Sequence, residues 1–461
     1  MAKIHKKIRR TQEDVPKAVD MDGLLPGHKG SHCHYDLIIV GAGPSGLFCA
    51  INSMQKGKKI LILEKKSSPG HKLLISGSGQ CNITHAGNIW DFLDHFGDHD
   101  HARFLRPALL GFTNKDLISF FKGLGLGMVR EESDKIFPET MQARDVLNIL
   151  TMQCREKGVV IKCNQEVESI TRKEDGFLVC CQSGSYRSRL LVIATGGCSY
   201  PATGSSGDGY RFAGILGHRI VEIGPALTPL LIKDYPFSEL AGLSFPDMKI
   251  SLYRHAKIRE HRGDVLFTHQ GLSGPGILDL SRYIRREDVL KLSFVPDDKR
   301  KVLEEWLVDR ARQDGRRSLL SVLADLPHVM LLSVPSSVPS SVPLLPHLSS
   351  RLTKKILGIS GIASDLHLAQ LTREMRNRLI DNLTGLPLVI SDLGGNNLAM
   401  VTRGGVDTIE VDPKTMQSRL VEGLYLVGEV LDIDGDTGGY NLQAAFSTGM
   451  LAARSIKNKF S

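Results

Sequence analysis

The segment Asp36-Leu-Ile-Ile-Val-Gly-Ala-Gly-Pro-Ser-Gly46 joins a short apolar run to a turn with three glycines. The apolar run predicts a buried strand, and the residues from Leu47 to Gln55 predict a helix with small and apolar residues on one face. A second apolar run, Lys59 to Leu63, predicts another strand and ends beside Glu64. This order of elements predicts the βαβ opening of a Rossmann-type α/β fold.

The spacing Gly41-x-Gly43-x-x-Gly46 gives each glycine a physical task. The first permits the tight turn, the second lets a pyrophosphate approach the backbone, and the third lets the helix pack close to the sheet. The helix N-terminus offers free N–H groups and its positive dipole end to a phosphate. The carboxylate of Glu64 can accept hydrogen bonds from both hydroxyls of an adenosine ribose. We therefore predict a dinucleotide site, although this motif alone does not separate FAD from NAD.

Four further motifs follow along the chain. They are Gly70-His-Lys-Leu-Leu-Ile-Ser-Gly-Ser-Gly-Gln-Cys-Asn-Ile-Thr84, Ala194-Thr-Gly-Gly-Cys-Ser-Tyr-Pro-Ala-Thr-Gly-Ser-Ser-Gly-Asp208, Phe267-Thr-His-Gln-Gly-Leu-Ser-Gly-Pro275 and Gly423-Leu-Tyr-Leu-Val-Gly-Glu-Val-Leu-Asp-Ile-Asp-Gly-Asp-Thr-Gly-Gly-Tyr-Asn-Leu-Gln443. With these motifs in this order, the chain from about residue 36 to 455 resembles the FAD-binding flavoprotein family that includes aminoacetone oxidase and the bacterial 3-dehydro-bile-acid reductase.

The resemblance implies an FAD-dependent oxidoreductase that moves a hydride between a small organic substrate and flavin N5. It leaves open whether the flavin exchanges electrons with O₂, as in an oxidase, or with NAD(P)H, as in a reductase. The chain has one dinucleotide fingerprint, so NAD(P)H would bind only transiently. The family usually has Arg where this chain has Gln80, and Asn where this chain has His85. The activity of any one member is therefore not carried over from the resemblance.

The resemblance also implies where FAD lies along the chain. The ADP part would be held by Gly41, Gly43, Pro44, Ser45, Gly46, Glu64 and Lys65, the adenine by the backbone of Val167, and the pyrophosphate by Thr195, Gly196 and Gly197. The ribityl and phosphate region would meet Glu429 and Gly435, and the flavin would lie beside Lys72, Ser76, Gly77, Cys81, Asn82, Gly439, Asn441 and Leu442. A helix that starts near Asn441 would stabilise negative charge at N1 and O2 of a reduced flavin.

No catalytic residue is assigned from the sequence. Three residues are candidates: His269 in a glycine-rich loop, Tyr440 at the flavin-side turn, and Cys81. His269 has equal claims to touching a substrate and to stabilising its loop. For Tyr440 and Cys81 we favour a packing role beside the flavin, because lone buried thiols are usually inert and aromatic rings usually pack.

The pattern along the chain predicts a split domain organisation. Residues 1–35 read as a flexible basic extension, 36–217 as the first part of the FAD-binding domain, 218–296 as a β-rich insert on the substrate side, 297–387 as a helical insert, and 388–461 as the second part of the FAD-binding domain. The repeat Ser333-Val-Pro-Ser-Ser-Val-Pro-Ser-Ser-Val-Pro343 predicts an extended surface loop inside the helical insert.

Composition limits the classes of protein to consider. The chain has 461 residues, a formal net charge of +8 and eight cysteines without a C-x-x-C pair or zinc spacing. We expect a reduced cytoplasmic protein without a metal, a signal peptide or a membrane span. We expect a small-molecule substrate and no nucleic-acid partner, and the oligomeric state is open. The alternative is a flavin-binding scaffold or RNA-linked factor without turnover, which would use the basic extension as its contact.

Overall fold

The computed structural model describes residues 33–131, 134–327 and 348–460. The predicted basic extension up to residue 32 and the Ser333–Pro343 repeat lie outside the described residues.

Seven strands of the described residues form the main sheet, in the order β6-β2-β1-β9-β8-β7 with β18 paired to β9. Their bounds are β1 Cys33–Val40, β2 Ile60–Leu63, β6 Val160–Lys162, β7 Val167–Lys173, β8 Gly176–Cys181, β9 Gly184–Ile193 and β18 Leu424–Leu426. The β1, β2 and β6 strands pair in parallel, and β18 pairs in parallel with β9 through Leu424 and Leu191. Both ends of the sequence therefore build one sheet, which confirms the predicted Rossmann-type domain split in sequence.

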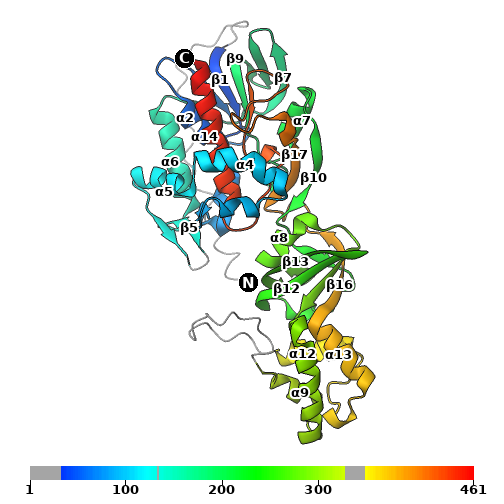
Figure 1. The fold of residues 1–461 in the computed structure, drawn as a ribbon. Coiled ribbons are helices and arrows are strands. Elements are labelled where there is room, and N and C mark those ends of the chain that lie inside the picture. Colours follow the sequence, from blue (N-terminus) through cyan, green and yellow to red (C-terminus); the bar gives the residue numbers. More distant parts are fainter. Residues whose placement is uncertain (1–32, 132–133, 328–347, 461) are drawn as a thin grey trace. The chain divides into compact units, whose positions relative to one another are not determined.

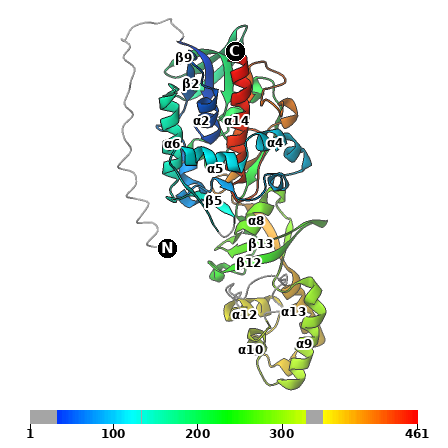
Figure 2. The same ribbon diagram turned by 60° about the vertical axis from the view of Figure 1, so that its left-hand side comes forward.

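Helix α2 (Pro44–Ser53) and helix α14 (Tyr440–Phe460) lie side by side, drawn in blue and red in Figures 1 and 2. Close approach is possible because Gly449 has no side chain, and a Cβ there would come within 2.7 Å of the Ser45 carbonyl oxygen. Phe446 of α14 packs edge-on against Phe48 of α2 with ring centroids 5.1 Å apart. The C-terminal helix is thus part of the core that surrounds the glycine-rich turn.

Further helices and two small sheets complete this part of the chain. The helices are α3 (His71–Ile75), α4 (His99–Gly111), α5 (Asn114–Gly123), α6 (Ala143–Glu156) and α7 (Asp208–Ile215), and the sheets join β3 (Thr84–His85), β5 (Lys135–Pro138) and β4 (Met128–Arg130), and β10 (Ile220–Ala226) with β17 (Val401–Val406). In the described part of the chain no helix is both long and apolar enough to cross a membrane.

The predicted β-rich insert is a closed barrel in the strand order β11-β14-β13-β12-β15-β16. Its strands are β11 Leu230–Ile232, β12 Ser244–Arg254, β13 Ala256–Phe267, β14 Gly271–Ser273, β15 Val289–Ser293 and β16 Leu386–Leu393. Strand β16, orange in Figure 1, follows the helical segment in sequence yet pairs with β15 and β11. The predicted boundary at residue 388 therefore falls inside a barrel strand. Beside the barrel, α8 (Pro275–Leu280) and a 3₁₀ turn, η5 (Ser281–Tyr283), follow β14.

The helical segment contains α9 (Arg300–Gln313), α10 (Leu319–Ala324), α12 (Ser350–Ile359) and α13 (Arg373–Gly385). Its buried leucines, such as Leu303 and Leu379, belong to the same apolar cluster as Leu290 and Leu292 of the barrel. The helical and β-rich segments therefore share one core. The division into separate domains at the predicted boundaries stays a prediction.

Candidate functional site

The glycine-rich turn has the geometry that its spacing predicts. Gly41 has a φ of +106°, and a Cβ on it would overlap the Ala194 carbonyl oxygen. A Cβ on Gly46 would overlap the Gly41 carbonyl oxygen, so this residue lets α2 start directly against the turn. Gly43 is different, because a Cβ there would meet nothing within 4 Å. It is the N-cap of α2, and no side chain caps this helix end. The turn therefore presents open space in front of an uncapped helix N-terminus.

Glu64 is fixed beside this turn. Its Oε2 accepts a hydrogen bond from Ala42 N at 3.0 Å, and its Oε1 accepts one from Lys66 N at 2.8 Å. Each carboxylate oxygen keeps a second lone pair, so the carboxylate can still accept bonds from a ligand. The predicted contact with a ribose is compatible with this arrangement and stays a prediction.

The C-terminal loop closes over the same turn. Gly428 lies so close to Ser45 that a Cβ on it would come within 2.7 Å of Ser45 Oγ. Its neighbour Glu429 pairs with Lys72 Nζ at 2.7 Å and accepts hydrogen bonds from Ser199 Oγ at 3.1 Å and Thr402 N at 3.0 Å. Three motifs that are far apart in sequence thus meet at one carboxylate. Sequence reasoning missed Ser199 and Thr402. A backbone N–H donor such as that of Thr402 leaves no signal in the sequence, and the hydroxyl of Ser199 reaches Glu429 only through the fold.

The remaining residues predicted to hold the ADP part come from several elements of the Rossmann-type domain. The Thr195–Gly197 segment begins next to the Ala194 carbonyl that touches Gly41. Val167 is buried at the start of β7, where it pairs with Cys181. Lys65 forms an ion pair with Asp208 at 2.5 Å. Pro44 is the first residue of α2, a position whose backbone N–H has no partner within the helix, so a proline fits there.

Three of the residues predicted to lie beside the flavin, Asn82, Gly439 and Asn441, meet at the N-terminus of α14. The Asn82 side-chain amide donates to the Thr84 carbonyl at 3.0 Å and accepts from Gly439 N at 3.2 Å. Asn441 accepts from Gly435 N and donates to the Gly435 carbonyl, both at 2.8 Å. Gly439 cannot carry a side chain here, since a Cβ would come within 2.6 Å of the Thr84 backbone. These side chains fix the turn before α14 and hold it against the 70–84 motif.

The three catalytic candidates lie in different surroundings. Cys81 is fully buried with a φ of +62°, and burial raises the pKa of its thiol to about 12, so it stays protonated at neutral pH. Tyr440 is the first residue of α14 and stacks on His95, with ring centroids 4.0 Å apart, and on His85 at 5.3 Å. His269 is exposed in the turn between β13 and β14. These surroundings favour packing roles for Cys81 and Tyr440.

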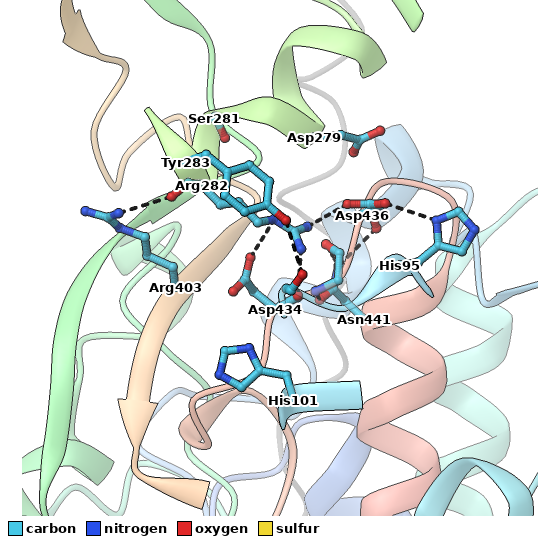
Figure 3. Close-up of polar contacts among 12 residues, drawn as sticks. His95, His101, Asp279, Ser281, Arg282, Tyr283, Arg403, Asp434, Asp436 and Asn441 are labelled. Atoms are coloured by element: carbon cyan, nitrogen blue, oxygen red, sulfur yellow. Dashed lines mark hydrogen bonds and ion pairs between the residues drawn. The ribbon is translucent and has the colours of Figure 1, made fainter. Parts of the chain in front are cut away.

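A charged cluster that the sequence did not reveal lies beside the turn before α14 (Figure 3). We call Asp279, Arg282, Asp434 and Asp436 the carboxylate cluster. Arg282 Nε lies 3.0 Å from Asp434 Oδ2, Arg282 Nη2 lies 2.9 Å from Asp436 Oδ1, and both Arg282 and Asp434 are almost completely buried. Asp436 also pairs with His95 at 3.0 Å. Arg282 comes from the barrel side and both of its partners come from the C-terminal loop, so the cluster joins these two parts.

Comparison with known proteins gives a family match over most of the chain. The model of the HI0933-like protein Rossmann domain matches residues 35–455. The chain is 31% identical over 426 residues to the ribosomal RNA dihydrouridine synthase of Escherichia coli strain K12, covering 92% of this chain and 98% of that protein. It is 30% identical to the 3-dehydro-bile acid delta(4,6)-reductase of Clostridium scindens, covering 91% and 98%. The ribosomal RNA dihydrouridine synthase of Haemophilus influenzae is also 30% identical, with coverage of 92% and 98%.

Proposed function

The chain belongs to the HI0933-like family, in which a Rossmann-type domain carries FAD, and we propose that this protein is an FAD-dependent reductase of a carbon–carbon double bond conjugated to a carbonyl group. The observation that carries FAD binding is the open space in front of Gly43, in a turn where Gly41 and Gly46 permit close backbone contacts. Backbone hydrogen bonds fix the carboxylate of Glu64 beside this turn.

The residues present fit FAD. The uncapped N-terminus of α2 suits a pyrophosphate, since free N–H groups and a helix dipole both favour a negative charge there. The 21-residue helix α14 begins directly after the Gly438–Gly439 turn, so the positive end of its dipole favours negative charge on a flavin beside that turn. We propose that FAD lies between these two helix ends, along the residues named from the sequence.

The reaction class follows from what the relatives have in common. Dihydrouridine differs from uridine by two hydrogens across one carbon–carbon bond, and a delta(4,6)-reductase likewise saturates carbon–carbon double bonds. In both cases a carbonyl group is conjugated to the bond that is reduced, which makes the distal carbon electrophilic. When bound and reduced by an electron donor, FAD would supply the hydride for such a carbon. The protein must hold the substrate against the flavin, exclude water and deliver a proton to the other carbon.

Several residues of this chain have positions suited to those tasks. Asn82 and Asn441 hold the turn before α14 in one conformation, so a ligand beside it meets a fixed surface. The stack of Tyr440 with His95 and His85 places aromatic rings at the same helix end. We propose that this stack forms one wall of the substrate site, because flat conjugated rings pack well on aromatic faces.

The electron donor and the substrate class follow as further proposals. We propose a reduced nicotinamide as the electron donor. The chain has one dinucleotide fingerprint, which we assign to FAD, so the nicotinamide would bind only transiently. The expected small-molecule substrate would be a conjugated ketone such as a 3-oxo-4,6-diene steroid. The expectation that nucleic acid is not a partner stays a prediction, and it competes with a uracil base in RNA, which the net charge of +8 would help to attract.

Rapid anaerobic mixing tests this function. We expect NADH or NADPH to bleach the bound flavin, and one of two probes, a 3-oxo-4,6-diene steroid or unmodified ribosomal RNA, to restore its colour with formation of the saturated product. Oxidation of the reduced flavin by O₂ faster than by either probe would indicate an oxidase instead. A flavin that no donor reduces and no probe oxidises would contradict the proposal and favour a scaffold without turnover.

A further inference from the structure

Asp279 lies where the barrel side meets the turn before α14. It projects from α8, and its Oδ1 accepts a hydrogen bond from Thr437 N at 2.7 Å. Its Oδ2 lies 3.3 Å from Thr437 Oγ1, which donates to it. Thr437 directly precedes the Gly438–Gly439 turn, so this carboxyl group contacts the segment that we propose to lie beside the flavin. Figure 3 shows Asp279 next to Asp436, on the side of the cluster where His95 lies.

The carboxylate cluster has too little positive charge for all of its acids to ionise easily. Arg282 forms ion pairs with Asp434 and Asp436, and Asp436 has a second partner in His95. The hydrogen bonds of Asp279 go to the neutral Thr437. Burial, with the negative charge of Asp436, raises the pKa of Asp279 to about 6 against the opposing effects of Thr437 and Arg282. Asp279 therefore combines a carboxyl group that can hold and release a proton near neutral pH with direct hydrogen bonds to the segment before α14.

Reduction of a conjugated double bond needs such a group. A hydride adds to the carbon distal to the carbonyl, the electron pair of the double bond moves toward the carbonyl, and a proton must then bind to the proximal carbon. A carboxyl group with a pKa near the working pH is suited to this step, because it is partly protonated before the transfer and stable as an anion after it. The Thr437 N–H and hydroxyl would stabilise the carboxylate that remains.

We propose that Asp279 is the general acid that protonates the substrate carbon during this reduction, and that solvent reprotonates it afterwards. The inference rests on the proposed function. The other titratable groups around it are less suited. Arg282 stays cationic, Asp434 is almost completely buried in its ion pair with Arg282, and Asp436 is paired on both of its oxygens. Burial raises the pKa of Tyr440 further above neutrality. Burial lowers the pKa of His261, so this imidazole is mostly neutral.

The first test uses the spectrum of the bound flavin and needs no turnover. Asp279→Asn keeps the size of the side chain and can still accept from Thr437 N, but it has no proton to lose. We expect the absorption of the oxidised flavin in the wild-type holoenzyme to change with pH around a midpoint near 6, and this change to disappear in Asp279→Asn. Asp247→Asn, at a carboxylate that is 66% exposed on the barrel, is the matched control and should keep the transition. A transition that persists in Asp279→Asn would overturn the proposal.

The second test separates proton delivery from electron transfer. Reduced enzyme is mixed anaerobically with whichever of the two probes the wild type reduces, and separately with ferricyanide, whose reduction requires no carbon to be protonated. We expect Asp279→Asn to slow oxidation by the probe about 100-fold and to leave the ferricyanide rate unchanged, with partial recovery in Asp279→Glu. Equal rates of wild type and Asp279→Asn with the probe would overturn the role proposed for Asp279 and leave the proposed function standing. If the wild type reduces neither probe, the proposed function itself fails.

Discussion

Replacing Gly43 with valine is expected to give a folded chain that no longer retains FAD. A Cβ at this position meets nothing within 4 Å, so the protein has room for a side chain here, but the isopropyl group would occupy the space where a pyrophosphate approaches the helix N-terminus. Losing two charge-assisted hydrogen bonds of about 1.5 kcal/mol each would weaken FAD binding by about 100-fold or more. The measurement is FAD affinity by fluorescence quenching, with circular dichroism of the cofactor-free protein to check the fold.

Gly123→Val is the matched control for this prediction. Gly123 ends α5, a Cβ there also meets nothing within 4 Å, and no ligand is proposed near it. This variant should bind FAD like the wild type. Gly46→Ala should behave differently from both, because its Cβ would overlap the Gly41 carbonyl oxygen and the fold itself would be strained. Full flavin content in Gly43→Val would show that the turn does not bind the pyrophosphate.

Replacing Arg282 with methionine is expected to destabilise the fold by about 3 to 5 kcal/mol at neutral pH. The guanidinium side chain is only 4% exposed, and its removal leaves the carboxylates of Asp434 and Asp436 without the cation that both contact. Arg312→Met is the control, since Arg312 is 76% exposed and pairs with an exposed Asp309, and it should change stability by less than about 0.5 kcal/mol. Urea unfolding of the FAD-loaded proteins, followed by circular dichroism, measures both effects.

The loss of folding stability in Arg282→Met should grow as the pH rises. Burial raises the pKa of Asp434 in the folded protein, and removing Arg282 takes away the main charge that opposes this rise. A carboxyl group with a raised folded pKa costs nothing below its unfolded pKa and destabilises the fold as pH rises through the folded value. The variant should therefore lie closest to the wild type at about pH 5 and farthest from it at about pH 8. A constant difference over this range would contradict the buried ion pair.

The local patterns of the sequence were sufficient to predict the main elements that open and close the Rossmann-type domain. The helix predicted from Leu47 to Gln55 is α2 (Pro44–Ser53), and the helix predicted to start near Asn441 is α14 (Tyr440–Phe460). Both have an apolar face at helical spacing, and such periodicity is the strongest signal in a single sequence. The glycine spacing predicted the turn because only glycine tolerates the close backbone contacts at Gly41 and Gly46.

Pairings between distant segments were not predictable in this way. Strand β16 is a short apolar run directly after α13, and its sequence does not reveal that it closes a barrel begun at residue 230. The carboxylate cluster was missed for a related reason. Asp434 and Asp436 lie in the Gly423–Gln443 motif, whose sequence names no partner for either carboxylate, and a charged residue such as Arg282 is expected at the surface. Only the fold brings this arginine into that loop.

The cofactor released by the purified protein tests the central claim most directly. The protein is denatured, the supernatant is separated by chromatography, and the flavin is identified and counted per chain. We predict a yellow protein that releases one FAD per chain, because we propose that Glu64 and the Gly41–Gly46 turn bind the adenosine ribose and the pyrophosphate, which FMN lacks. Release of FMN alone, or a colourless protein that FAD does not reconstitute, would contradict the account.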